Sequence, residues 1–159
     1  MYTINIVCVG KLKEKYLTDA CNEYIKRLGA YCRVNVIELN EERLKNENQA
    51  SIDEVIKAEG RNIISKLPQS DYIIAMCIEG TQLASEQLAE KIRSIADQGK
   101  SRISFVIGGS YGLSDDVKAL TDFKLSLSKM TFTHQISRML ILEQIYRAFQ
   151  INENGKYHK

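Results

Sequence analysis

Apolar and polar positions along the chain follow two patterns that alternate with each other. Short runs in which apolar residues alternate or are continuous predict strands. Longer stretches with apolar residues on one helical face predict helices. The predicted strands are Tyr2–Val9, Arg33–Leu39, Asp71–Ile78, Arg102–Ile107 and Phe123–Leu127. The predicted helices cover 19–27, 51–66, 85–97, a short segment from Ser114, and 134–151.

Strands and helices alternate regularly from the first residue to the last. This order is typical of an α/β fold, with a mostly parallel open sheet and helices on both faces. The chain has 159 residues, a single proline and no repeat or linker-like stretch. We therefore expect one domain covering residues 1–159.

Several polar residues are placed to begin helices. Thr18 is suited to capping the first helix, and Ser51-Ile-Asp-Glu54 has the spacing of a capping box. Ser114 and Thr133 are suited to capping the last two helices. These residues set the expected helix boundaries.

The last predicted helix is apolar over an unusually wide arc. A surface helix normally has one apolar stripe, whereas here few positions are polar. The apolar residues are Ile136, Met139, Leu140, Ile141, Leu142, Ile145, Tyr146, Ala148, Phe149 and Ile151. One side would cover the sheet, and the other predicts a partner, most simply a second copy in a homodimer.

Composition and apolar run length exclude several classes of protein. Apolar residues make up 44% and charged residues 26%, which is ordinary globular usage. The longest apolar run, Tyr72–Ile78, is far shorter than the roughly 20 residues of a membrane span. The basic cluster at Lys11, Lys13 and Lys15 follows the first apolar stretch, the wrong order for a signal peptide. We expect no membrane association and a cytoplasmic location.

Cysteine and histidine spacing argues against a metal site. Cys8, Cys21, Cys32 and Cys77 form no C-x-x-C pair, so reduced and inert thiols are expected. The only two histidines, His134 and His158, lie far apart in the sequence and have no nearby carboxylate cluster. No metal is predicted.

The net charge of +2 is too small for a simple nucleic-acid coat protein. The distribution is uneven, because residues 1–33 and 101–159 are mildly basic and residues 34–60 are acidic. A solvated mixed surface explains this pattern, but basic ends that meet in space could also form a phosphate-binding face.

Three loops follow predicted strands and are candidates for a ligand site. They are Ile78–Ser85, Gly108–Gly112 and Ser126–His134. Open α/β sheets bind ligands beyond the carboxyl ends of their strands, which is where these loops would gather.

The glycine-rich loop Gly108-Gly-Ser-Tyr-Gly112 admits three interpretations. It matches no phosphate-binding motif, but it matches G-x-S-x-G, with Ser110 as nucleophile and with aspartates and His134 following in order. The short spacing to His134, and a helix expected to start at Ser114 rather than at the serine, argue against a serine hydrolase. The loop could otherwise be a plain glycine turn, or it could let a flat ligand approach the backbone.

Four stretches together carry a resemblance to a known family. They are Phe105-Val-Ile-Gly-Gly-Ser-Tyr-Gly-Leu113, Leu125-Ser-Leu-Ser-Lys-Met-Thr-Phe-Thr-His-Gln135, Arg138 with Glu143-Gln-Ile-Tyr-Arg-Ala148, and Tyr157-His-Lys159. In order and spacing the chain resembles the ribosomal RNA large subunit methyltransferase H family. The resemblance implies the SPOUT superfamily, an α/β fold with a C-terminal trefoil knot, and a homodimer. It also implies S-adenosylmethionine as donor, and as acceptor N3 of a pseudouridine in 23S ribosomal RNA within the assembled ribosome.

The resemblance also assigns a donor pocket by position. Its residues are Met76, Gly108, Leu127, Ser128, Lys129, Met130, Thr131 and Phe132. Glycine and exposed loop amides suit adenosine, which needs close backbone approach. Many relatives have proline where Thr133 stands and leucine where Met76 stands, so the rigidity of the loop is the property most affected.

The resemblance and the residue chemistry suggest how the acceptor is held. His158 could accept the N3 proton, Tyr157 could stack on the base, and Lys159 could hold a phosphate, all over the donor pocket of the other subunit. His134 and Arg138 are further candidates for contacting RNA. A non-catalytic RNA-binding or ribosome-binding module of the same fold is the alternative function.

Overall fold

A computed structural model describes residues 1–69 and 71–159. Its five strands form one sheet in the order β2-β1-β4-β3-β5, with every neighbouring pair parallel. The strands are β1 Tyr2–Val9, β2 Cys32–Leu39, β3 Tyr72–Gln82, β4 Arg102–Ile107 and β5 Phe123–Ser126. The helices are α1 Lys15–Leu28, α2 Gln49–Lys66, α3 Ser85–Asp97, α4 Asp115–Ala119 and α5 His134–Asn152.

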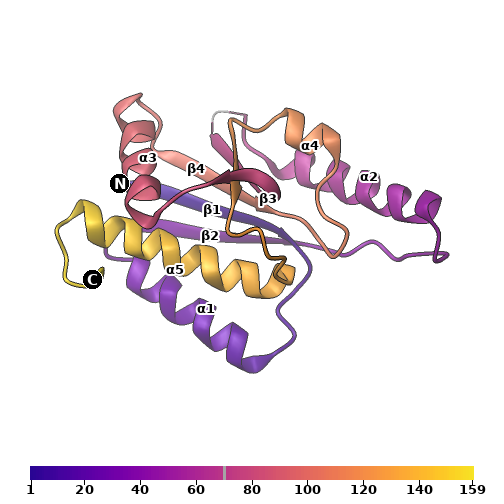
Figure 1. The fold of residues 1–159 in the computed structure, drawn as a ribbon, viewed down its shortest axis with the longest axis horizontal. Coiled ribbons are helices and arrows are strands. Elements are labelled where there is room, and N and C mark those ends of the chain that lie inside the picture. The colour runs from indigo at the N-terminus through magenta and orange to yellow at the C-terminus, as the bar shows by residue number, and fades with distance from the viewer. Residues whose placement is uncertain (70) are drawn as a thin grey trace.

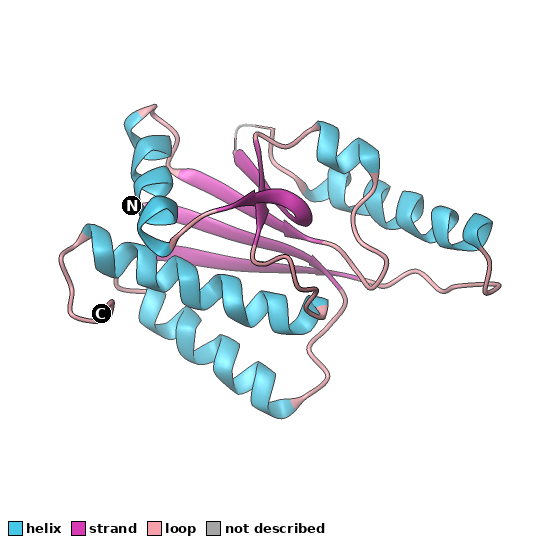
Figure 2. Cartoon of the chain, in the orientation of Figure 1, coloured by secondary structure: helices cyan, strands magenta, loops and turns pink. Residues whose placement is uncertain are grey.

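Helices cover both faces of the sheet, as Figures 1 and 2 show. On β1, Ile4 and Ile6 face the core shared with α1, α3 and α5. Val7 and Val9 face the smaller core under α2 and α4. This division follows from the period-2 alternation of side chains along a strand. The predicted α/β class is confirmed.

Two predicted helix starts are wrong. α1 begins at Lys15, and the Thr18 hydroxyl donates to the Glu14 carbonyl from inside the helix (3.3 Å). α2 is capped by Asn48, whose side chain accepts from the Ser51 amide (2.8 Å). Since an asparagine caps at least as well as a serine, the earlier residue takes the cap and the Ser51–Glu54 box lies within the helix.

The predicted caps of the last two helices are confirmed. The Ser114 side chain accepts from the Val117 amide (3.2 Å), and the Thr133 side chain accepts from the Ile136 amide (3.2 Å). The position of α5 therefore depends in part on a residue at the end of the loop that follows β5.

Strand β3 extends beyond its predicted end and contains an irregularity. Met76 and Thr81 both pair with Leu125 on β5, so the residues between them leave the ladder. A Cβ added at Gly80 would come within 2.8 Å of the Lys124 backbone, so only glycine permits this approach. The loop predicted from Ile78 is therefore partly a bulged strand.

The apolar arc of α5 is largely covered within the chain. The helix lies on the sheet beside α1 and α3, and none of its residues is fully exposed. Its outer side near Tyr146 is covered by the tail residue Tyr157 (ring centroids 4.8 Å apart). The homodimer inferred from this arc stays a prediction, as does the trefoil knot.

Three of the four cysteines are buried and the fourth, Cys77, is half-buried, all of them free thiols. Burial raises the pKa of Cys8 to about 11 and that of Cys32 to about 12. Both thiols therefore stay protonated near neutral pH, which fits the inert role predicted for them.

Across residues 1–69 and 71–159, no helix combines the length and apolar content needed to cross a membrane.

Candidate active site

A cavity of about 870 Å³ opens where β3, β4 and β5 end. This is the carboxyl edge of the sheet, where ligands of open α/β folds bind. The predicted donor-pocket residues that line it are Met76, Gly108, Leu127, Ser128, Met130, Thr131 and Phe132. Lys129 is exposed and is not among the lining residues. The structure thus brings together three loops that are well separated in the sequence.

The glycine loop forms a tight turn that closes on itself. The Gly112 amide donates to the Gly109 carbonyl (3.1 Å), and Gly112 has φ +88°. A Cβ at Gly108 would lie 2.8 Å from the Gly112 carbonyl, so Gly108 is needed for the turn itself. The result is a backbone wall for the cavity.

The loop after β5 is held by its own serines. The Ser126 hydroxyl donates to the Ser128 carbonyl (2.9 Å), and the Met130 amide donates to the Ser128 hydroxyl (3.0 Å). These bonds hold the backbone while leaving the Met130 side chain 75% exposed. The loop therefore presents apolar groups to the cavity from a fixed backbone.

Exposed apolar side chains are concentrated at this cavity. Of the eight large hydrophobic side chains exposed in the described part of the chain, five line it. They are Tyr16, Ile78, Tyr111, Met130 and Phe132. Single exposed apolar residues are common, but a cluster of them around a hollow indicates a ligand site.

A charged pair lies at the same cavity. Lys118 Nζ is 2.5 Å from Glu79 Oε1, and both residues line the walls. The hydrogen bond from Lys118 holds the pKa of the Glu79 carboxyl below its usual range. Apolar walls, exposed backbone and charged groups together suit a ligand that has both a flat apolar part and charged groups.

The serine-hydrolase interpretation is not supported by the geometry. Ser110 and His134 line the same cavity, but His134 Nε2 has no hydrogen-bond partner among the described residues. His134 lies instead beside Glu41, with Nε2 3.1 Å from Oε1 and without hydrogen-bond alignment. The helix after the glycine loop begins at Asp115, capped by Ser114, so Ser110 does not stand on a nucleophile elbow.

The two residues expected to contact RNA differ in exposure. His134 lines the cavity at the start of α5 and is partly exposed. Arg138, one turn further on, is only 3% exposed. Its guanidinium binds Glu38 Oε2 (2.7 Å) and the Gly10 carbonyl (2.9 Å). This arrangement favours a structural role for Arg138, and an RNA contact by either residue stays a prediction.

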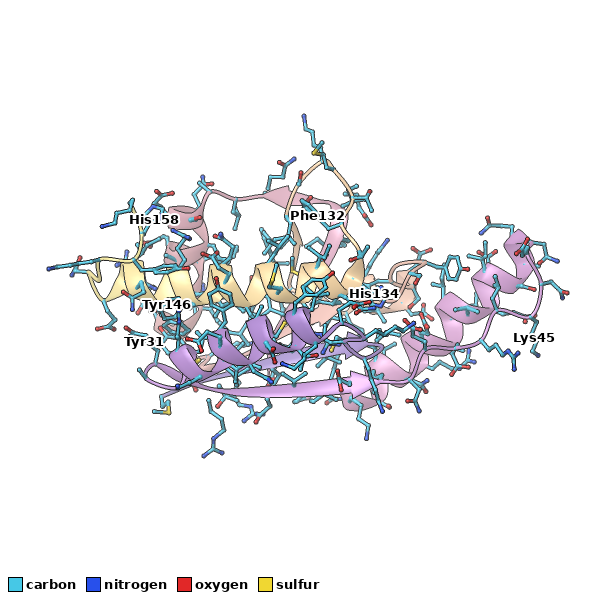
Figure 3. All side chains as sticks on the ribbon, turned by 90° about the horizontal axis from the view of Figure 1, so that it is seen from below. Tyr31, Lys45, Phe132, His134, Tyr146 and His158 are labelled. Atoms are coloured by element: carbon cyan, nitrogen blue, oxygen red, sulfur yellow. The ribbon has the colours of Figure 1, made fainter. Side chains whose placement is uncertain are left out.

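The C-terminal tail lies against its own chain, away from the cavity. The Tyr157 hydroxyl donates to Glu143 Oε1 (3.0 Å), while His158 contacts Arg147 on α5 and Glu86 on α3. Lys159 is exposed. Figure 3 shows His158 and His134 toward opposite ends of α5. Within one chain, the tail and the donor pocket are therefore separate.

Sequence reasoning missed several residues that line the cavity or hold the tail. Tyr16 was not predicted at all, whereas Ile78 and Tyr111 lie in two of the loops predicted to form a ligand site but were not assigned to the donor pocket. Apolar residues in polar loops after strands are the signal that could have identified these two. Glu143 and Arg147 belong to a stretch that carries the family resemblance, but no contact with the tail was predicted for them. Their spacing of four residues, which places them on one face, was the available signal.

Within the described part of the chain, no group of three or more His, Cys, Asp or Glu side chains converges as a metal site would require.

Comparison with known proteins places the chain in a family. Residues 2–158 match the family described as "Predicted SPOUT methyltransferase". The chain is 49% identical over 158 residues to the ribosomal RNA large subunit methyltransferase H of Clostridium novyi (strain NT), covering 98% of this chain and 99% of that protein. It is 46% identical over 157 residues to the protein of the same name from Clostridioides difficile (strain 630), with 98% and 99% covered.

A solved structure supports the fold. A probable methylase family protein from Haemophilus influenzae Rd KW20 superposes with a TM-score of 0.54 at 16% identity, covering 98% of this chain and 70% of that one. At this identity the likeness concerns the fold alone. The profile match and the two close relatives, each aligned over nearly its full length, show that this chain belongs to the ribosomal RNA large subunit methyltransferase H family of SPOUT methyltransferases.

Proposed function

We propose that this protein transfers a methyl group from S-adenosylmethionine to N3 of a pseudouridine in 23S ribosomal RNA of the assembled ribosome. One observation carries the proposal. The residues that the family resemblance assigns to the donor pocket, apart from Lys129, line one cavity at the carboxyl edge of the sheet. The close relatives bear the name of an enzyme of this class.

The proposed chemistry asks little of the protein beyond binding and alignment. A sulfonium donor supplies an already activated methyl group, so displacement at the methyl carbon needs no metal. The apolar walls at Met76, Ile78 and Phe132 would hold the donor and exclude water from it. The backbone of the Gly108–Gly112 turn would fix its orientation, which is the main contribution to the rate of such a transfer.

The acceptor base is proposed to be held by the partner subunit of a homodimer. Tyr157 and His158 contact Glu143 and Glu86 and do not line the cavity of their own chain, so they would act on the other one. Tyr157 would stack on the base, His158 would contact its edge, and Lys159 would bind a phosphate. His134, at the cavity wall, is placed to contact the same RNA. An assembled ribosome as substrate puts this activity in the cytoplasm.

The test is transfer of a labelled methyl group to intact ribosomes that lack this modification, with free subunits and naked RNA alongside. Label at a pseudouridine of 23S RNA, from intact ribosomes only, is the expected result. Label at another nucleotide would identify a different methyl acceptor. No label from a folded dimer that binds ribosomes would favour the non-catalytic RNA-binding module.

Deletion of residues 157–159 tests the tail separately. We expect the truncated protein still to bind S-adenosylmethionine measurably, because the residues that line the cavity lie outside the tail. Methyl transfer should be lost. A truncated enzyme that methylates ribosomes at the full rate would show that the tail takes no part in the reaction.

A further inference from the structure

Both ring nitrogens of His158 have a defined partner. Arg147 Nη1 lies 3.2 Å from His158 Nδ1, and Glu86 Oε1 lies 2.7 Å from His158 Nε2. The two partners differ in kind. A guanidinium has hydrogen-bond donors and no acceptor, whereas a carboxylate accepts only. The ring therefore lies between a group that can only donate and a group that can only accept.

This arrangement determines where the proton of His158 resides. Nδ1 must accept a hydrogen bond from Arg147. A proton on Nδ1 would point at the Nη1–H of Arg147, and neither group could then accept. Nε2 must then carry the proton and donate it to Glu86, whose carboxyl pKa is lowered by its own backbone amide and by His158. We propose that Arg147 is a positioning residue that fixes the Nε2–H tautomer of His158, so that His158 acts on the acceptor base as a hydrogen-bond donor and not as a proton acceptor.

Arg147 is itself held firmly enough to do this. Its Nε and Nη2 lie 3.1 and 2.5 Å from Glu143 Oε1, one helical turn away on α5. The guanidinium carbon lies 4.7 Å from the centroid of the Tyr157 ring, and the Tyr157 hydroxyl donates to the same Glu143 oxygen. Burial and hydrogen bonding raise the pKa of Tyr157, so it stays a donor. The fork of Arg147 thus has one nitrogen directed at His158.

The charged and titratable groups around His158 come from three elements. Glu143 and Arg147 belong to α5, Glu86 belongs to α3, and Tyr157 and Lys159 are its neighbours in the tail. Of the two His158 partners, Glu86 is the more exposed, with 63% of its side chain accessible against 23% for Arg147. An incoming oxygen can therefore replace Glu86 at Nε2 while Arg147 continues to hold Nδ1.

The effect of this tautomer on methyl transfer rests on the proposed function. An imide N–H becomes more acidic when a neighbouring carbonyl oxygen receives a hydrogen bond, because the bond is stronger to the anion. Donation from Nε2 to such an oxygen would stabilise negative charge as N3 loses its proton to solvent water. The N3 lone pair then forms the bond to the methyl carbon while the sulfur–methyl bond breaks. His158 ends the step with the same proton it had at the start.

The tautomer can be measured directly, without ribosomes. The chain has two histidines, so a 15N-histidine-labelled sample gives two ring spin systems, and His158→Gln assigns them. The expected result is a protonated Nε2 and an unprotonated Nδ1 for His158 in the intact protein near pH 8. In Glu86→Gln, whose side chain can donate or accept, Arg147 alone should keep the same tautomer, whereas the double variant Glu86→Gln with Arg147→Gln should give a mixture. A proton on Nδ1, or a mixture in the unaltered protein, would overturn the proposal.

Kinetics on ribosomes tests the role. His158→Gln keeps an N–H donor and cannot act as a base near neutral pH, so it should retain at least a third of kcat, whereas His158→Ala should lose about 100-fold. Arg147→Gln should lower kcat about 10-fold and leave the KM for the donor unchanged. Arg93→Gln, on exposed α3 surface, is the matched control and should change neither.

Different results would exclude the donor role of His158 and the proposed methyltransferase activity. If the unaltered protein methylates ribosomes and His158→Gln is as inactive as His158→Ala, His158 is a base and the inference is wrong. If the pH profile of kcat/KM loses its acidic limb in His158→Gln, the same conclusion follows. If the unaltered protein does not methylate at all, the proposed function fails, and the nitrogen spectrum still decides the tautomer.

Discussion

Arg138 and Glu38 are joined across 100 positions of the sequence by an ion pair in which Nη1 lies 2.7 Å from Oε2. The same guanidinium donates to the Gly10 carbonyl at 2.9 Å, where β1 ends. The arginine side chain is only 4% exposed, and that of Glu38 is 35% exposed. One side chain on α5 thereby connects the helix to the carboxyl ends of β1 and β2.

Removing this arginine should destabilise the protein strongly. Arg138→Ala leaves the Glu38 carboxylate and the Gly10 carbonyl without their partner. Breaking a buried pair costs about 3–5 kcal/mol, and because Glu38 is partly exposed we expect about 2–4 kcal/mol here. Urea unfolding followed by circular dichroism measures this loss.

The control is Arg93→Ala, which removes an arginine from an exposed pair with Glu90 on α3. It should cost no more than about 1 kcal/mol. The double variant Arg138→Met with Glu38→Leu should lose less than the sum of the single changes, because no charge is left alone. Equal effects of Arg138→Ala and Arg93→Ala would show that the buried pair adds nothing to stability.

Thr133 offers a test of whether a hydroxyl cap or a proline ring stabilises the start of α5 more. Its φ of −61° is the value that a proline ring imposes, and its hydroxyl caps α5. Thr133→Ala should cost about 1 kcal/mol of stability, because the cap is lost. Thr133→Pro loses the cap too, but should recover about 0.4–1 kcal/mol from the restricted unfolded chain.

We therefore expect the order of stability wild type, then Thr133→Pro, then Thr133→Ala, measured as urea midpoints. A lower urea midpoint for Thr133→Pro than for Thr133→Ala would mean that the ring disturbs Phe132, since proline restricts the residue before it. In that case the hydroxyl cap and the proline are not interchangeable in this loop.

The periodicity of the sequence was sufficient for the sheet and its two helical layers. Alternation along Ile4, Val7 and their neighbours assigns each strand face to a core, and that pattern is local. The bulge between Met76 and Thr81 could not be read in the same way. It depends on how closely Gly80 approaches the Lys124 backbone, a contact between residues 44 positions apart.

In the candidate site, too, features set by local sequence were predictable and features set by long-range contacts were not. The three loops at the cavity were expected because they follow strands that end at one edge of the sheet, and the individual residues were assigned by the family resemblance. The partners of His158 were not, because Glu86 and Arg147 come from two different helices and meet only when α3 packs beside α5. The burial of Arg138 could not be predicted from the sequence either. It depends on the contact with Glu38, 100 positions away, and only the fold brings the two residues together.

The partly desolvated carboxyl of Glu59 should make the free energy of unfolding depend on pH. Burial raises its pKa above the ordinary value of 4.5, Glu41 and Glu42 raise it further, and the Glu42 amide opposes the shift. Its Oε1 has no hydrogen-bond partner among the described residues. Between 4.5 and the raised pKa the folded protein binds more protons at this site than the unfolded chain, so this site lowers stability as pH rises through that window.

Glu59→Gln removes the charge and keeps an acceptor for the Glu42 amide. We expect the variant to gain stability relative to wild type as pH rises from 4.5 to 7, and the two to converge at lower pH. Urea unfolding at several pH values measures the difference. Glu54→Gln, exposed on the same helix, is the control and should show no such trend. A difference that grows toward low pH would contradict the assigned direction.

Phe132 gives the most direct test that the cavity binds the donor. The side chain is 40% exposed and lines the cavity, so Phe132→Ala should change folding stability by less than about 1 kcal/mol. Loss of an aromatic wall should weaken S-adenosylmethionine binding about 5–20-fold, as measured by isothermal titration calorimetry. Leu120→Ala is the matched control, because Leu120 is 51% exposed and does not line the cavity. Equal donor affinities for the two variants would mean that Phe132 does not touch the donor, and a donor that binds neither variant nor wild type would remove this cavity as its site.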